Sequence, residues 1–146
     1  MHGHEVYDYA VVRVVPRVER EEFVNAGVIL SCQRTGHLQA AVALDEQRLL
    51  ALDPNVDLET VRRHLSAIVA ICEGAAHGGP IARLPMRSRY HWLTAKRSSI
   101  IQTSPSHMGL CLQPGEALAR TRENLHAQLF FGFADLAADG GLRDKQ

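Results

Sequence analysis

The chain has 146 residues, a length typical of a single domain that can bury a hydrophobic core without disulfides or metals. Its 16 basic and 16 acidic side chains give a formal net charge of zero, which excludes a bulk field that attracts nucleic acid or membranes. The three cysteines are odd in number and widely spaced, which argues against a disulfide framework and indicates buried free thiols.

The N-terminal residues lack the basic and apolar regions of a signal peptide. No apolar run approaches the roughly 20 residues that a membrane helix needs. We therefore expect a cytoplasmic protein that has no contact with a membrane.

The first third of the chain predicts antiparallel strands joined by short turns. Strands are expected over residues 7–15, 23–32 and 38–44. Pro16 ends the first strand, and Gly36 is available for a positive φ in the turn before the third. The three strands form a meander.

Helical signals follow. Residues 45–52 predict a short helical turn, and Asp57 is expected to cap a longer helix. Apolar residues spaced three and four apart give this helix one buried face: Leu58, Val61, Leu65, Ile68 and Cys72. Glycines from Gly74 onwards end it, and residues 81–96 are expected to be less regular.

The last part of the chain predicts a fourth strand at residues 100–103 and a second main helix that begins near Pro114. The expected fold class is α+β, an antiparallel meander sheet of about four strands with two main helices packed on one face. We expect one domain over residues 1–132 and a flexible C-terminal tail over residues 133–146.

The segment EEFVNAGVIL, which begins at Glu21, is the most informative part of the chain. Strand interiors disfavour Asn25 and Gly27 unless packing or a ligand compensates. The polar side chains that the topology places on or beside three strands of one sheet are Arg13, Glu21, Asn25 and Gln102. An arginine binds anions, a glutamate accepts protons or binds a cation, and amides orient a polar ligand. The alternative is a buried ion pair between Arg13 and Glu21, with the amides satisfying strand ends.

A basic loop is the second candidate site. Arg89, Lys96 and Arg97 surround Trp92, the only tryptophan, so the loop can hold an anionic group. The alternative is a solvated loop that Trp92 anchors to the core. Stacking on nucleic acid usually requires more than one exposed ring, so we disfavour that class of ligand.

Catalytic and metal-binding patterns are lacking in the sequence. The eight histidines are dispersed and form no HExxH motif, and neither a GxSxG elbow nor a phosphate-loop glycine pattern occurs. We predict no metal and no cofactor, and the sequence leaves open whether the protein is an enzyme.

The order of these elements resembles a bacterial family, domain of unknown function 3037. The resemblance rests on the strand YAVVRVVP, the segment EEFVNAGVIL, the later HWLTAKRSSIIQTSPSHMGL and the closing helix near Pro114. It implies a compact cytoplasmic bacterial protein, often encoded beside a HipA-like kinase. The residues that match the family pattern, without assigned roles, are Arg13, Pro16, Glu21, Asn25, Gly27, Arg97 and Gln102.

Three functions fit these observations. The first is a binding or regulatory module that acts with a protein partner, which the resemblance implies is a HipA-like kinase. The second is an enzyme or sensor for a small anionic or nucleotide-like ligand, held in a polar cleft by Arg13 and Arg97 with Glu21 as base or cation ligand. Nucleic-acid processing ranks third, because it requires a continuous positive surface.

Overall fold

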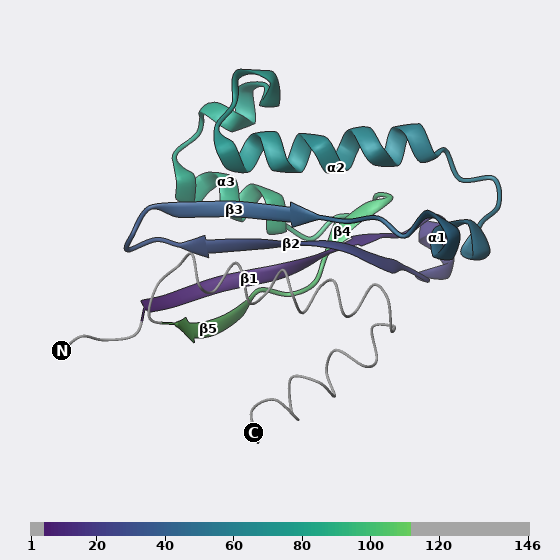
Figure 1. Cartoon of the computed structure of the whole chain (residues 1–146), viewed down its shortest axis with the longest axis horizontal. Helices are drawn as coiled ribbons and strands as arrows, with labels where there is room; N and C mark the ends of the chain where they lie inside the picture. Colours follow the sequence, from purple (N-terminus) through teal and green to yellow (C-terminus); the bar gives the residue numbers. More distant parts are fainter. Residues whose placement is uncertain (1–4, 112–146) are drawn as a thin grey trace.

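The structure is a computed structural model that describes residues 5–111 (Figure 1). The expected helix near Pro114 and the expected tail at residues 133–146 lie outside the described residues. Within this range the fold is α+β, as predicted, and no helix is long and apolar enough to cross a membrane.

The sheet has five strands, all of which pair in antiparallel fashion. The strands are β1 (Glu5–Val14), β2 (Val24–Cys32), β3 (His37–Val42), β4 (Ile101–Thr103) and β5 (His107–Cys111). The first three form the predicted meander, and Gly36 in the β2–β3 turn has the expected positive φ of 71°. The strand order is β3-β2-β1-β4, with β5 also paired to β1.

β4 and β5 run along the same edge of β1, one after the other. β4 pairs with β1 near Val14, and β5 pairs with the N-terminal half of β1. Between β4 and β5, the Ser104 side chain takes the place of a backbone acceptor. Its Oγ accepts a hydrogen bond of 2.9 Å from the Val11 amide. The Ser104 amide donates to the Val11 carbonyl at 2.8 Å. The sequence predicted β4 but not β5, since the intervening Ser-Pro-Ser reads as an end of the strand.

Three α-helices accompany the sheet in the described range: α1 (Glu46–Leu52), α2 (Leu58–Glu73) and α3 (Met86–Thr94). Asp45 and Asp57 cap α1 and α2 through their side chains, and Gly74 ends α2 in a left-handed conformation. α2 and α3 lie on the same side of the sheet (Figure 1). The sequence thus predicted both α1 and α2 correctly. Short 3-10 turns occur at η1 (Val18–Arg20), η2 (Ala76–Gly78) and η3 (Pro80–Arg83).

α3 lies where the sequence predicted a less regular region. Its first turn has no side-chain cap, and its buried residues are Tyr90 and Leu93 alone, so its local signals are weak. Tertiary contacts compensate. Arg89 donates from Nη1 to the carbonyls of Ile71 and Cys72, both at 2.8 Å, and thereby joins α3 to the C-terminal end of α2.

The main core lies between the sheet and the helices α2 and α3. Val12 and Val14 of β1 pack there with Leu65 and Ile68 of α2 and with Leu93 of α3. Every residue of β2 is buried. The two cysteines whose side chains are described, Cys32 and Cys72, are buried free thiols, as expected.

Candidate functional site

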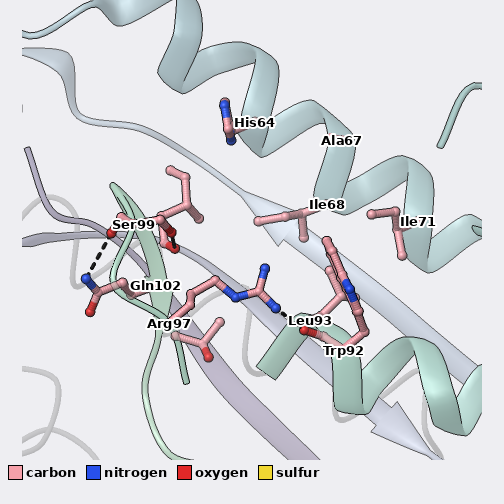
Figure 2. A pocket seen from close by; sticks show the side chains of 11 residues that line it. His64, Ala67, Ile68, Ile71, Trp92, Leu93, Arg97, Ser99 and Gln102 are labelled. Atoms are coloured by element: carbon pink, nitrogen blue, oxygen red, sulfur yellow. Dashed lines mark hydrogen bonds between the residues drawn. The ribbon is translucent and has the colours of Figure 1, made fainter. Parts of the chain in front are cut away.

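A cavity of about 310 Å³ opens between α2, α3 and β4 (Figure 2). Its volume is at the lower end of the range for small-molecule sites. The polar or aromatic side chains that line it are His64, Trp92, Arg97, Ser99, Gln102 and Thr103. The apolar ones are Ala67, Ile68, Ile71, Leu93 and Ile101.

The apolar wall follows from the packing of the elements. Ile68 and Ile71 lie on the buried face of α2, and Leu93 is the buried residue of α3 that faces them across the cavity. Ile101 pairs with Val14 in the sheet, which turns its side chain and that of Thr103 towards the helices. The cavity is thus built on regular elements along most of its surface.

Arg97 is held at the C-terminal end of α3. Its guanidinium carbon lies 4.5 Å from the centroid of the Trp92 ring. Its Nε donates to the Ala95 carbonyl at 3.3 Å, and one Nη donates to the Trp92 carbonyl (Figure 2). A cation is favoured at this position, because the carbonyl end of a helix carries partial negative charge.

The cavity has positive character. Arg97 is the one lining residue with a permanent charge, and no carboxylate among the described residues lines the cavity. A guanidinium has five N–H donors, of which the backbone carbonyls use two. The remaining donors can bind a carboxylate or phosphate in a bidentate manner.

Gln102 and Ser99 organise the turn that leads into β4. The Gln102 amide donates to the Ser99 carbonyl at 2.9 Å, and the Ser99 hydroxyl donates to the Ile101 carbonyl at 2.8 Å (Figure 2). Gln102 therefore borders the cavity while its amide nitrogen is engaged by the backbone.

Arg13 lies in a row with two of the other predicted residues. It pairs with Asn25 of β2 on one side and with Gln102 of β4 on the other. Because directly paired residues share a face of a sheet, all three side chains project from the same face. Val12 and Val14 pack under the helices, so this face is the one opposite α2 and α3.

The Arg13 guanidinium lies over Phe23, with 4.3 Å between its carbon and the ring centroid. Asn25 is only 6% exposed. Neither the Nε of Arg13 nor the Oδ1 of Asn25 has a hydrogen-bond partner in the described part of the chain. Burial lowers the pKa of Arg13, which means that the surroundings disfavour its charged form.

Glu21 is exposed in the β1–β2 connection. It has a left-handed backbone with φ of 57°, and its amide donates to the Val18 carbonyl at 3.2 Å. No ion pair joins it to Arg13, although both residues are described. The buried ion pair considered from the sequence is therefore not formed.

The single cleft that the sequence suggested is thus divided between two places. Arg97 and Gln102 line the cavity on the helical side, whereas Arg13 and Asn25 lie on the opposite face. Gln102 borders the cavity at the sheet edge, but its side chain projects from the same face as that of Arg13. The sequence did not single out His64 or Thr103, although His64 precedes the predicted core residue Ile68 by one helical turn.

The predicted basic loop is also divided. Trp92 lines the cavity and is 40% exposed. Arg89 is directed to backbone carbonyls, including that of Leu84 at 3.0 Å. Lys96 is exposed to solvent.

Comparison with known proteins identifies a family. Residues 9–125 match the model of a family described as a protein of unknown function, DUF3037. No curated protein and no solved structure matches the chain. The match covers most of the chain and includes Arg13, Glu21, Asn25, Arg97 and Gln102. The chain therefore belongs to the DUF3037 family.

Proposed function

We propose that the protein is a binding module, or sensor, for a small anionic ligand that occupies the cavity between α2, α3 and β4. The observation that carries this proposal is the placement of Arg97. It is stacked on Trp92, has free N–H donors, and lies at a cavity wall without a carboxylate among the described residues.

The lining residues indicate the chemistry of the ligand. Its carboxylate or phosphate group binds to Arg97, and the hydroxyl of Thr103 offers a further hydrogen bond. The remainder packs on Ile68 and Ile71, which favours a compact apolar or planar body, such as an aromatic or nucleotide-like one. Neither a carboxylate nor a thiol among the described residues lines the cavity, so we propose binding and assign no turnover.

Fluorescence provides a direct test, because Trp92 is the only tryptophan in the chain. Titration with benzoate and with phenyl phosphate is expected to change its emission, whereas benzamide, which has the same ring but no charge, is expected to bind more weakly. Replacing Arg97 with Met should weaken anion binding by about tenfold or more, since charge-assisted hydrogen bonds are lost.

Two matched variants complete this test. R63M removes an exposed arginine from α2, outside the cavity lining, and is expected to bind like the wild type. R97K keeps the charge but loses the planar fork, so we expect intermediate binding. Equal binding of benzoate by the wild type and R97M, or no Trp92 response to either anion, would exclude an anion site in the cavity.

A protein partner is the second candidate function, and the exposed apolar residues on the β1–β5 side favour it. Met108 of β5 is 72% exposed and Val6 of β1 is 50% exposed. Within the described residues β5 pairs only with β1, so its other edge can add a strand from a partner. The family resemblance points to a HipA-like kinase as that partner.

Co-expression with the HipA-like kinase from the same genome, followed by size-exclusion chromatography, tests this candidate. We expect co-migration that M108E abolishes, because it places a charge in the apolar contact. Q39E adds the same charge on the exposed opposite edge strand and should retain the complex. Separate elution of the two wild-type proteins would count against this partner.

A further inference from the structure

The pair of Arg13 and Asn25 contains two polar atoms that the described fold leaves unmatched. The two residues are directly opposite in the β1–β2 register, so their Cβ atoms are about 5 Å apart. The Nε of Arg13 is a buried donor and the Oδ1 of Asn25 a buried acceptor, and neither has a hydrogen-bond partner among residues 5–111. Buried polar groups are almost always satisfied, so such a pair requires an explanation.

The charge of Arg13 is also uncompensated. No carboxylate among the described residues forms an ion pair with it, and its side chain contacts the ring of Phe23. A partly buried guanidinium without an anion is energetically unfavourable, so its presence in the fold requires an explanation. The same protein pairs Arg62 with Glu46 through two bonds of 2.8 Å, so its fold supplies carboxylate partners elsewhere.

The unmatched atoms define the group that would complement them. Arg13 requires an anionic acceptor, and Asn25 requires a donor beside it. A carboxylate that has an amide N–H nearby offers both. Acylated amino acids and the acidic residues of a peptide contain this pair of groups. Phe23, the ring that the Arg13 guanidinium covers, is 38% exposed, so rotation of Arg13 off this ring would give a ligand access from solvent.

We propose that Arg13 and Asn25 form a second recognition site, on the face of the sheet opposite the cavity, for a carboxylate with an adjacent amide N–H. Arg13 binds the carboxylate, and Oδ1 of Asn25 accepts from the N–H. The site is separate from the Arg97 cavity and goes beyond the function proposed for it.

Side-chain NMR tests this proposal, because each site has its own reporter. The Arg13 Nε–H and Asn25 amide signals report the second site, and the Trp92 indole N–H reports the cavity. Titration with N-acetylglycine should shift the Arg13 and Asn25 signals together and saturably. N-acetylglycinamide, which keeps the amide N–H but lacks the carboxylate, should leave them in place.

Peptides distinguish the source of the carboxylate. Acetyl-Gly-Asp-Gly-amide presents an internal acidic side chain, and acetyl-Gly-Asn-Gly-amide is its neutral counterpart. Tighter binding of the Asp peptide than of N-acetylglycine supports recognition of an acidic segment in a polypeptide, and the reverse order supports a small acylated amino acid. Unchanged Arg13 and Asn25 signals with both carboxylates would overturn the proposal, whatever happens at Trp92.

Variants separate recognition from a structural role of Arg13. R13M keeps the length of the side chain and should weaken carboxylate binding by about tenfold or more, while the melting temperature without ligand stays equal or rises. A lowered melting temperature in R13M together with unchanged binding would show that Arg13 is structural. R13K identifies the Arg13 signal by its loss, and R63M, on the opposite side of the sheet, should bind like the wild type.

Discussion

At the scale of single residues, Gly27 explains part of the polar interruption in the EEFVNAGVIL segment. A Cβ at this position would lie 2.7 Å from the carbonyl oxygen of Ala41 and 3.0 Å from a methyl group of Val42. Glycine is therefore required by the close approach of β3, which is the packing compensation that the sequence suggested. Asn25 has no such explanation, because its Oδ1 has no hydrogen-bond partner in the described part of the chain.

Ser104 is a residue whose role the sequence did not reveal. It is 3% exposed and supplies the acceptor for the Val11 amide in place of a backbone carbonyl. S104A leaves that partly buried N–H without a partner, so we expect a loss of about 1–3 kcal/mol in the free energy of unfolding. Urea denaturation measures this loss. S98A, at an exposed position nearby, should change stability by less than about 0.5 kcal/mol, and an equal effect of both would contradict the assigned role.

At the scale of elements, the sequence predicted those whose signals lie in their own residues and missed those that depend on residues distant in sequence. α2 is encoded by its own residues, from the Asp57 cap through the apolar spacing to Gly74, and it forms as predicted. α3 depends on partners distant in sequence, such as the α2 carbonyls that accept from Arg89. β5 continues the edge of the sheet only because the Ser104 side chain accepts from the Val11 amide in place of a backbone carbonyl. When only neighbouring residues are considered, Ser104 and the proline that follows it indicate the end of a strand.

The connection between α2 and α3 yields a prediction. R89M removes three hydrogen bonds from a charged donor to the carbonyls of Ile71, Cys72 and Leu84, two of them at the end of α2. We expect a loss of about 1.5–3 kcal/mol in the free energy of unfolding. R87M removes an exposed arginine from the same helix and is the matched control in thermal or urea unfolding. If both variants lose the same stability, Arg89 does not hold the helices together.

At the scale of the whole molecule, the sequence placed Arg13, Asn25 and Gln102 on or beside strands of one sheet but did not predict the face from which their side chains project. The reason is the β-bulge between β1 and β2 near Arg13. In a regular ladder continued from Val12 and Gly27, Val14 would pair with Asn25, and the amide would point into the core beneath α2. The bulge turns Asn25 to the face of Arg13. Neither the composition nor the alternation of apolar and polar residues along the strands predicts such a one-residue shift.

Buried titratable groups predict how the stability of the whole fold depends on pH. Burial raises the pKa of the Cys72 thiol from 9.0 to about 12, and burial also raises the pKa of Tyr90 above its ordinary value. A raised pKa means that the folded state keeps its proton while the unfolded state loses it, so these groups stabilise the fold fully below pH 9. The free energy of unfolding should therefore fall as the pH rises from 9 towards about 12.

Urea unfolding at a series of pH values measures this slope, and Cys72→Ala isolates the contribution of the thiol. The variant is less stable at neutral pH, because it leaves a space in the core, but its stability should decline less steeply above pH 9.

Thiol labelling independently tests whether Cys72 is buried and protonated in the folded protein. Cys72 should react slowly with iodoacetamide at neutral pH in the folded protein and quickly in urea, since a buried neutral thiol is a poor nucleophile. A parallel pH dependence in the wild type and the variant would show that Cys72 titrates alike in the folded and unfolded chains.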